Sequence, residues 1–531
     1  MNIRKKQQGM TLIALAVTII VMLILAGVTI AALTSENGII NQANTVKETN
    51  KVAKTEEEAR LEYSNLILEK QMDGHGETTE LSEVIERLEE NGYETVEKDG
   101  KNYIKIGEYY YEIKLENEQV SIAREKTEGI TGGIAGTKYE DDTKVKIRGK
   151  EVSIPAGATI SKISGEYENV DNGVVIYIIN DDRANWDNVE YMHKTYDQFV
   201  WVPVDKNNVI LDLSTTYATL DEAGIMAKVQ EQINAGKYPM AIKTDATNYI
   251  GVLYQFTEET NGVVVAPNSN WTPKSSKGWT SISSYREPLG LGDNIFGDIS
   301  SNLAQINGIL GTTYTDASSF EKELQKQYNV MVEKVKNAGG FWIGRYETSN
   351  MDTNQVASKK GTTSGISTGI TWYEMYANQS LYSKNILKNL NSKTTKTSSM
   401  IWGSQYDQIM IWMKNIKNDK ETTRGKYYVT NGVAKGNYGK ITINGNEIKD
   451  GNDNTTLPAS TGSRDEYRVK NIYDLAGNVW EWTLEAGSNK IRTVRGGGYD
   501  IQMAEYSRPD IRSFTYPNTR DAYHGSRLTI Y

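Results

Sequence analysis

The 531-residue sequence contains no cysteine. Disulfide frameworks, thiolate catalysis and cysteine metal sites are therefore excluded. Histidine is almost absent as well, and the three that occur, His75, His193 and His524, lie far apart in the chain. Scattered histidines of this kind predict no histidine metal cluster, and they argue against a Ser-His-Asp triad.

Acidic residues outnumber basic ones. The formal net charge is −9, which argues against a nucleic-acid partner, because phosphate binding requires a basic face.

Phenylalanine is scarce, with 6 residues, whereas tyrosine is abundant, with 33. Tyrosine suits exposed contact surfaces, because its flat apolar body carries a polar tip; a plain compositional habit is the alternative. A chain of this length predicts about two to four folded units.

Charge is absent from one long run near the amino terminus. No charged residue occurs from Met10 until Glu36, and three basic residues, Arg4 to Lys6, precede the run. As a helix, residues 10–33 would span roughly 36 Å, enough to cross a bilayer. The basic flank places the amino terminus in the cytoplasm. We therefore expect a single-pass membrane-anchored or pilus-associated protein at the cell surface, with its C-terminal domain extracellular. A secretory signal peptide is the alternative, although its apolar region would be shorter.

The junction before this run resembles the prepilin leader of type IV pilins and pseudopilins. It has a short basic leader, a glycine at Gly9, and then Met-Thr-Leu-Ile opening the apolar stretch. The resemblance implies that a prepilin peptidase cuts after Gly9 and methylates the new amino terminus at Met10. It also makes pilus or pseudopilus subunits candidate partners. In most pilins the fifth mature residue is glutamate, whereas this chain has Ala14, which puts polymerisation into a filament in doubt.

The segments that follow predict a helix, a small spacer and a linker. After the leader, residues 1–9, a transmembrane and pilin-like helix is expected over residues 10–73, because spaced apolar residues continue without proline. A small α/β spacer is expected over residues 74–128, and a glycine-rich linker over 129–140. Within the spacer, apolar spacing predicts one short helix from Leu81, and two strands follow it over 103–106 and 109–115.

The remaining residues, 141–531, are expected to form one large domain with an N-terminal β extension. Two strands alternate across a turn at Gly149, and residues 174–179 form an apolar run typical of a buried strand. A longer helix is expected to start at Ser318, because Glu321 follows in a capping-box pattern, and to end at Gly339. Its apolar face is Phe320, Leu324, Tyr328, Met331 and Val335.

Six segments of this domain occur in a characteristic order. They are Phe199-Val-Trp-Val-Pro-Val204, Phe341-Trp-Ile-Gly-Arg-Tyr-Glu-Thr348, Gly369-Ile-Thr-Trp-Tyr-Glu374, Asn471-Ile-Tyr-Asp-Leu-Ala-Gly-Asn-Val-Trp-Glu-Trp482, Val494-Arg-Gly-Gly-Gly-Tyr499 and Gly525-Ser-Arg-Leu528. The series resembles the formylglycine-generating enzyme, or sulfatase-modifying factor, family over roughly Tyr196 to Tyr531. The resemblance implies an α/β (α+β) body with many loops, of the C-type-lectin-like kind.

The resemblance does not extend to the family's catalytic residues. The oxidase of that family binds copper through two cysteines just after the Arg-Gly-Gly motif, and the matching positions here are Ile501 and Tyr506. Neither side chain supplies a thiolate. Ergothioneine-type relatives use a histidine-based iron site, which scattered histidines do not support. We therefore expect no catalytic residues and no enzyme activity, because fold alone does not carry function.

The resemblance also implies a calcium site on the Gly-Asn-Val-Trp-Glu-Trp string. The implied ligands are the side chains of Asp474 and Glu481 and the carbonyls of Gly477 and Val479. Such a set makes physical sense, because calcium takes hard oxygen ligands. In the alternative, Asp474 caps the turn and Glu481 pairs with an arginine such as Arg495. The neighbouring tryptophans, Trp480 and Trp482, are expected to belong to the core.

The last stretch of the chain is rich in tyrosine, arginine and acidic residues. In the resembled fold it helps to build a recognition face, for which the candidates are Tyr499, Tyr506, Arg508, Arg512, Tyr516, Arg520 and Tyr523. Its composition also resembles the display segment of lectin-fold proteins diversified by retroelements. A polar surface with structural arginine–carboxylate pairs is the alternative.

These observations predict a non-enzymatic cell-surface binding protein, an adhesin or a minor pilin. Its lectin-like head would recognise an extracellular protein or glycan. A family enzyme with altered chemistry and a structural pilus subunit are the two alternatives.

Overall fold

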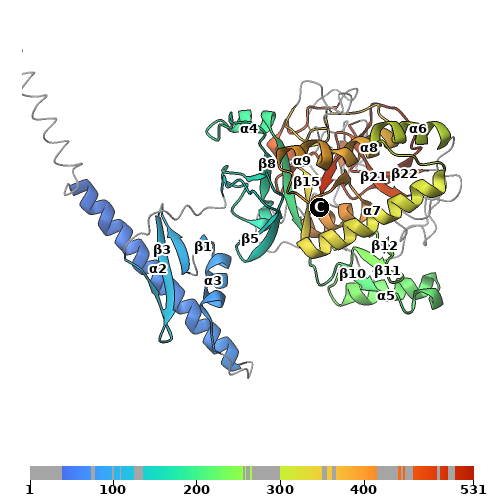
Figure 1. Cartoon of the computed structure of the whole chain (residues 1–531). Coiled ribbons are helices and arrows are strands. Elements are labelled where there is room, and N and C mark those ends of the chain that lie inside the picture. Colours follow the sequence, from blue (N-terminus) through green and yellow to red (C-terminus); the bar gives the residue numbers. More distant parts are fainter. Residues whose placement is uncertain are drawn as a thin grey trace, which may run out of the picture. The chain divides into compact units, whose positions relative to one another are not determined.

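The chain divides into two compact units, Met1–Gly133 and Ile134–Tyr531, which are described separately (Figure 1). The computed structural model describes residues 39–72, 78–98, 101–107, 109–124, 135–254, 257–258, 264–265, 299–349, 356–361, 366–414, 441–443, 446–448, 458–486, 491–499 and 509–531.

The first unit is a meander of four antiparallel strands that packs against one long helix. Its elements are α2 (Ile39–Met72), α3 (Leu81–Glu90), β1 (Thr95–Lys98), β2 (Lys101–Ile106), β3 (Tyr109–Glu116) and β4 (Gln119–Ile122). The helix α2 buries Val52 and Ala59 in a core shared with the sheet. The predicted helix α3 and strands β2 and β3 are confirmed. Sequence reasoning missed β1 and β4, because short strands with few apolar residues give no clear alternation.

The predicted membrane-crossing, pilin-like helix over residues 10–73 is corrected by the structure. Among the described residues, α2 spans Ile39–Met72, and none of the described helices is both long and apolar enough to cross a membrane. Lysine and glutamate recur along α2, and charged side chains are unfavourable in the apolar interior of a bilayer. The expectation of a single-pass membrane-anchored protein is corrected by the same finding. The apolar run and the processing site, Gly9 and Met10, lie outside the described residues.

The second unit is centred on a six-stranded antiparallel sheet. In spatial order its strands are β16 (Ser398–Met400), β25 (Leu528–Ile530), β15 (Gly340–Gly344), β9 (Asp197–Pro203), β8 (Val175–Ile178) and β7 (Thr159–Ile160). The central strands read as continuous apolar runs, because both of their faces are buried. Trp342 pairs with Trp201 across β15 and β9, and their rings lie 5.1 Å apart.

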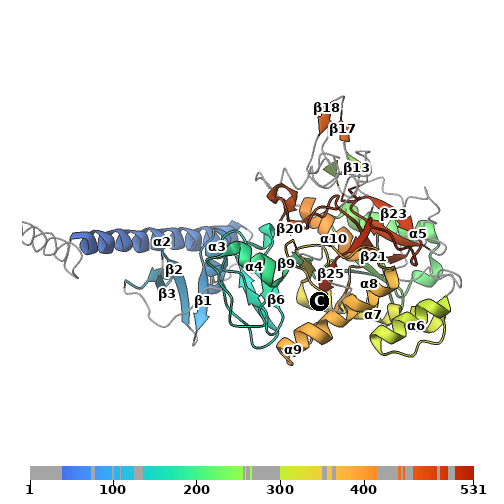
Figure 2. The same ribbon diagram turned by 90° about the horizontal axis from the view of Figure 1, so that it is seen from above.

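Smaller sheets surround this centre (Figure 2). A mixed sheet has the order β23 (Arg512–Thr515), β22 (Arg492–Arg495), β21 (Trp480–Ala486) and β24 (His524–Ser526), with β21 and β24 parallel. The others are the three-stranded β10 (Ile210–Asp212), β11 (Ala241–Lys243) and β12 (Tyr249–Gly251), and the pairs β5 (Thr143–Ile147) with β6 (Lys150–Ile154), β13 (Thr257–Glu258) with β14 (Val264–Val265), β17 (Ile441–Ile443) with β18 (Asn446–Ile448), and β19 (Arg468–Val469) with β20 (Ile472–Tyr473).

Helices cover these sheets. The α-helices are α4 (Val189–Thr195), α5 (Glu222–Asn234), α6 (Ile299–Leu310), α7 (Ala317–Ala338), α8 (Trp372–Tyr382), α9 (Lys388–Leu390) and α10 (Gly403–Lys414). A π-helical turn, Ser383–Leu387, joins α8 to α9, and short 3₁₀ turns occur at Val170–Asn172, Tyr217–Thr219 and Asp465–Tyr467.

The long helix α7 confirms the predicted apolar face, and it crosses the domain beside β15 (Figure 1). Its end at Gly339 is also confirmed, because that residue adopts a left-handed φ of 76°. The predicted start at Ser318 is wrong. Asp316 is the N-cap, and its carboxylate accepts a hydrogen bond from the Ser319 N–H at 2.7 Å. An aspartate two residues earlier competes successfully, because its oxygen reaches the free amides of the first turn.

We predict that Asp316→Ala destabilises the second unit by about 1 kcal/mol, whereas Ser318→Ala has almost no effect. Urea denaturation followed by tryptophan fluorescence measures this unit alone, because all 10 tryptophans lie beyond residue 185. A larger loss in Ser318→Ala than in Asp316→Ala would show that the cap is misassigned.

Candidate functional site

A tight turn leads into β21 at the centre of the motif that carries the family resemblance. Three of its residues have left-handed backbone conformations: Asp474 (φ 53°), Gly477 (φ 79°) and Asn478 (φ 65°). Glycine and asparagine tolerate this region better than other residues. Asn478 secures the turn, because its Nδ2 donates to Oε2 of Glu347 at 2.6 Å and its Oδ1 accepts from the Ala459 N–H at 2.8 Å.

Three buried carboxylates lie near the guanidinium of Arg527. Glu347, Asp474 and Glu481 are each 2% exposed or less, and Arg527 is 0% exposed. Arg527 donates to Oε1 of Glu481 from Nε at 2.8 Å and from Nη2 at 2.5 Å. Of these three acidic groups, only Glu481 is hydrogen-bonded to Arg527 among the described residues.

This excess of carboxylates is reflected in the pKa values. Burial raises the pKa of Glu347 well above its usual range, and the nearby Asp474 charge raises it further. Burial also raises the pKa of Asp474 to about 6, and it raises that of Glu481 despite the opposing effect of Arg527. All three groups thus favour either protonation or an additional cation.

The four residues implied as calcium ligands lie on this turn and on β21. Oε2 of Glu481 is buried and has no hydrogen-bond partner among the described residues, so a hard cation would satisfy it. Oδ2 of Asp474 already accepts from the Thr461 hydroxyl at 2.9 Å and the Gly462 N–H at 2.7 Å. In the described part of the chain, no three histidine or acidic side chains are grouped so as to hold a metal. Oε2 of Glu481 is therefore the group that a cation would use, whereas Oδ2 of Asp474 holds the turn.

The alternative ion pair exists, but with a different arginine from the one suggested by the sequence. Glu481 and Arg495 are direct cross-strand partners, yet the Arg495 guanidinium turns to Asp407, with Nη2 2.8 Å from Oδ1, and to Glu485 at 3.4 Å. Arg527, which is close to the end of the chain, takes Glu481 instead. The predicted core positions of Trp480 and Trp482 are confirmed, because both side chains are buried.

The candidate recognition face is only partly assembled at the surface. Tyr516 is 60% exposed and Tyr523 is 41% exposed, whereas Tyr499 is 2% exposed and packs against Tyr523 with ring centroids 5.5 Å apart. Arg512 turns inward and pairs with Asp407 and Glu485. Two more of the candidates, Tyr506 and Arg508, lie outside the described residues, as does Ile501.

The loop between β23 and β24, residues 516–523, carries the exposed tyrosines and is held at several points. The Pro517 carbonyl accepts from the Trp372 N–H at 2.9 Å, and the Asp521 carbonyl accepts from the Gly369 N–H at 2.7 Å. Arg520, midway along the loop, donates from Nη2 to Oε1 of Glu374 at 2.7 Å. These contacts hold the loop against α8 and the residues just before that helix. The exposed tyrosines of the loop therefore have a defined position.

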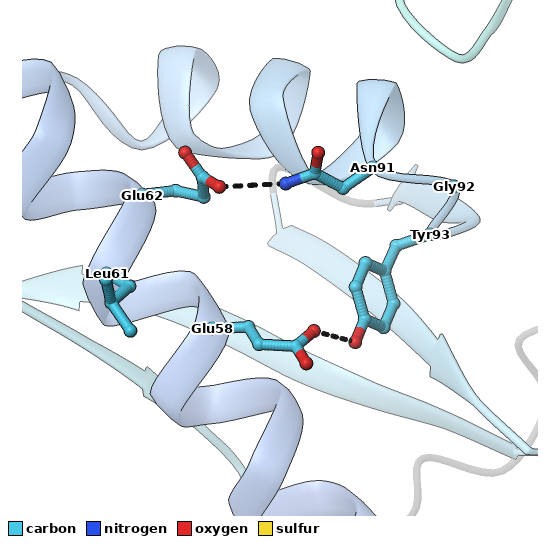
Figure 3. Close-up of a pocket in the computed structure, with 6 residues that line it drawn as sticks. All are labelled: Glu58, Leu61, Glu62, Asn91, Gly92 and Tyr93. Carbon is cyan, nitrogen blue, oxygen red and sulfur yellow. Dashed lines mark hydrogen bonds between the residues drawn. The ribbon is translucent and has the colours of Figure 1, made fainter.

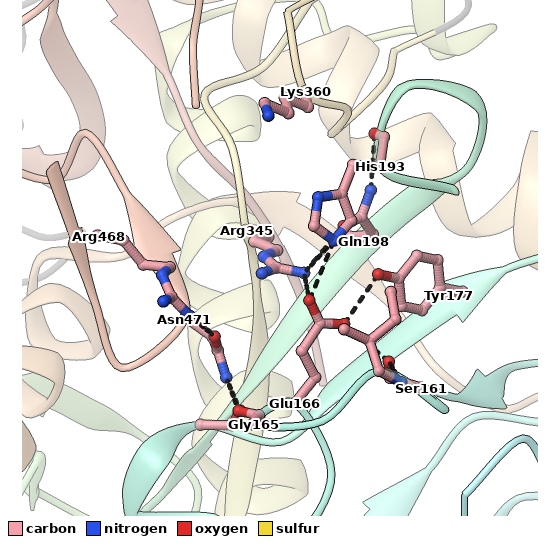
Figure 4. Close-up of polar contacts among 12 residues, drawn as sticks. Ser161, Gly165, Glu166, Tyr177, His193, Gln198, Arg345, Lys360, Arg468 and Asn471 are labelled. Carbon is pink, nitrogen blue, oxygen red and sulfur yellow. Dashed lines mark hydrogen bonds and ion pairs between the residues drawn. The ribbon is translucent and has the colours of Figure 1, made fainter. Parts of the chain in front are cut away.

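A second buried polar cluster was not predicted from the sequence (Figure 4). Oε1 of Glu166 accepts from Nη1 of Arg345 at 2.6 Å and lies 3.0 Å from Nε2 of His193. Oε2 accepts from the hydroxyls of Ser161 at 2.7 Å and Tyr177 at 2.8 Å. Only Arg345 belongs to a motif segment, and nothing in the sequence around Glu166 or His193 indicates a shared site. The cluster joins the N-terminal β extension to β15, and its acceptor oxygens are fully used.

Opposing effects act on the pKa values of this cluster. Burial raises the pKa of Glu166, but the Arg345 charge and the hydrogen bond with His193 lower it to about 2. Burial lowers the pKa of His193. The cluster is therefore an ionised Glu–Arg pair beside a neutral histidine, and its role is structural.

In the first unit, a hollow of about 450 Å³ lies between α2 and the turn after α3 (Figure 3). Both carboxylates that line it are already engaged. Tyr93 donates its hydroxyl to Glu58, and Nδ2 of Asn91 donates to Oε1 of Glu62 at 2.8 Å. The hollow therefore offers no free charged group to a ligand.

Residues 403–530 match the family model described as the sulfatase-modifying factor enzyme 1-like domain. This match covers the turn, β21, β22 and the exposed loop. No curated protein matches the chain. The family match and the geometry above are therefore the basis for the function proposed below.

Three solved structures are similar to about a third of the chain. CarF has 14% identity and a TM-score of 0.24, with 36% of this chain and 85% of that chain covered. PvdO from Pseudomonas aeruginosa has 16% identity and a TM-score of 0.23, with 36% and 81% covered. Treponema denticola variable protein 1 has 15% identity and a TM-score of 0.23, with 36% and 84% covered.

We predict that Glu166→Gln destabilises the second unit by roughly 3 kcal/mol, because it leaves the buried Arg345 charge without its counter-ion. The matched control is Asp171→Asn, which breaks the exposed pair with Lys150, 2.7 Å between Nζ and Oδ2. That change should cost no more than about 0.5 kcal/mol. Urea denaturation of both variants gives the comparison, and equal losses would contradict a central role for the cluster.

The same pair should make stability depend on pH. The Glu166 carboxyl has a pKa of about 2 in the folded state, against an ordinary value of 4.5. Its stabilisation is therefore complete above about pH 4.5 and is lost as the pH falls toward 2. The melting temperature of the wild type should fall in this window, and that of Glu166→Gln should fall less.

Proposed function

We propose that this chain is a non-enzymatic binding protein whose C-terminal domain recognises a protein or glycan through the loop at residues 516–523. The observation that carries the proposal is the exposure of Tyr516 and Tyr523 on one loop that main-chain hydrogen bonds hold in place. Binding residues are often found on loops that a rigid scaffold positions.

The chemistry of the loop supports recognition of a large ligand. Tyrosine gives a broad contact area with few rotatable bonds, so little conformational entropy is lost on binding. Arg520 lies between the two tyrosines in sequence and is half-exposed, with its guanidinium held by Glu374. An arginine fixed in this way can donate to carboxylates, hydroxyls or main-chain carbonyls of a ligand.

The absence of cysteine supports binding over family-type catalysis. The whole chain has none, so the thiolate pair that the resembled oxidase needs is missing. An enzyme with altered chemistry in the same domain is the alternative function. A peptide with a sulfatase-type cysteine separates the two, because conversion above a no-protein control, with or without copper, would overturn the non-enzymatic assignment.

We predict that Tyr516→Ala and Tyr523→Ala each weaken binding by about 30-fold, as expected for central tyrosines of an interface. The full chain is first probed on glycan and protein arrays, and the affinity for each ligand found is then measured by interferometry. The matched control is Tyr109→Ala in the first unit, a tyrosine that is 37% exposed. Retention of wild-type affinity in the double variant Tyr516→Ala, Tyr523→Ala would exclude the loop as the binding site.

We further infer that calcium binds at the turn before β21. The support is Oε2 of Glu481, which has no hydrogen-bond partner among the described residues, and the burial of Glu347 and Asp474 in the same cluster. A cation here would offset the repulsion among Glu347, Asp474 and Glu481. Arg527 and Asn478 would keep the turn in shape around it.

We predict that chelation lowers the melting temperature of the full chain and that added calcium restores it. A cation bound only by the folded state stabilises it by roughly 2.7 kcal/mol at a hundredfold excess over the dissociation constant. Asp474→Asn should reduce this response, and it leaves the Glu481–Arg527 pair intact. Asp245→Asn, at an exposed loop aspartate, is the control. A melting curve that does not change on chelation would contradict the calcium site and would leave Arg527 as the counter-charge of Glu481.

A further inference from the structure

A groove of about 390 Å³ lies at the edge of the six-stranded sheet. Its walls are the chain that continues β8, Ile178 to Asp181, and the helical turns that carry Asn385, Ile386, Asn389 and Leu390, with Lys138 at one side. This volume is within the range of ligand pockets. The groove uses no residue of the 516–523 loop.

Ile179, just after β8, lines this groove and has no main-chain hydrogen bond to any described residue. The register places Tyr177 opposite Thr159 of β7. In an antiparallel pair, alternate residues direct their main-chain N–H and C=O groups toward the same neighbouring strand. If β7 were longer, Ile179 would therefore pair with residue 157. Gly157 instead donates its N–H to the Tyr139 carbonyl at 2.6 Å. In the part of the chain that the structure describes, no main-chain hydrogen bond joins Ile179 to a partner.

Unused side-chain groups line the same groove. No hydrogen bond is formed by the side-chain amides of Asn180 and Asn385 among the described residues, whereas Asn389 donates to the Asn385 carbonyl at 2.7 Å. Each free amide offers both donors and an acceptor. These amides can therefore donate to the carbonyls and accept from the N–H groups of a peptide main chain.

The side chains on the floor of the groove and their charge restrict the class of ligand that it can bind. Ile179 is buried, and Ile386 and Leu390 are partly buried, so the floor is aliphatic with no aromatic ring to stack on a sugar. Asp181 is already paired with Arg183, whereas Lys138 forms no ion pair with any described residue. The net free charge of the lining is therefore positive.

We propose that this groove binds an extended peptide that adds to the sheet beside Ile179, places an aliphatic side chain on Ile386 and Leu390, and directs a carboxylate to Lys138. Strand addition of this kind takes its affinity from main-chain hydrogen bonds and its specificity from alternate side chains. The free amides of Asn180 and Asn385 bind the outer edge of the same peptide. A sheet edge left open in this way is a template for pairing.

The test uses the full chain and two fluorescein-labelled, amidated hexapeptides that alternate leucine and threonine. One ends in glutamate and the other in lysine. Fluorescence anisotropy should show about tenfold tighter binding of the glutamate peptide. Lys138→Glu should reverse this preference, and Lys237→Glu, which makes the same charge change at an exposed lysine outside the groove, should leave it unchanged.

Two further measurements test the main-chain pairing. N-methylation of alternate residues of the glutamate peptide should weaken binding about tenfold, because it removes the donors needed by a sheet edge. Asn385→Ala changes an exposed side chain that forms no hydrogen bond with any described residue, so it should weaken binding while leaving the melting temperature unchanged. The proposal is overturned if neither peptide binds at about 1 mM, if Lys138→Glu does not change the preference, or if N-methylation has no effect.

Discussion

The buried guanidinium of Arg527 joins the two main sheets of the large unit. It donates to Glu481 on β21, to the carbonyl of Gly344 at the end of β15 at 3.1 Å, and to the Tyr473 carbonyl at 2.9 Å. A fully buried charge persists only where its donors are satisfied. The positions of the turn, of β24 and of the loop before it therefore depend on this one side chain.

Around this link the domain has a rigid interior and a variable surface. Arg495 and Arg512 with Asp407 and Glu485 form a second buried set of ion pairs, and Glu166 with Arg345 forms a third. Pairs of this kind are weak evidence for high stability, but removal of one partner is costly. They hold the loop ends in place while the tyrosines between β23 and β24 stay exposed, an arrangement suited to binding.

The sequence was most informative where periodicity alone decides structure. The apolar face of α7, the hairpin of β5 and β6 and the buried strand β8 follow from spacing, because a helix repeats every 3.6 residues and a strand every two. It was less reliable at boundaries. Asp316 rather than Ser318 caps α7, since two neighbouring residues can both supply an oxygen to the first turn. The expected membrane-crossing helix was wrong for the described residues, where α2 carries charges along its length.

By itself, the sequence determined the apolar periodicities, the motif around Asp474 to Trp482, and the absence of any thiol chemistry. Which charges meet was decided only by the tertiary structure. Glu481 pairs with Arg527 rather than with its cross-strand neighbour Arg495, and Glu166 meets Arg345 from a distance of 179 positions in the chain. Burial and ion pairing depend on where strands far apart in sequence pack, and a local pattern contains no information about such contacts.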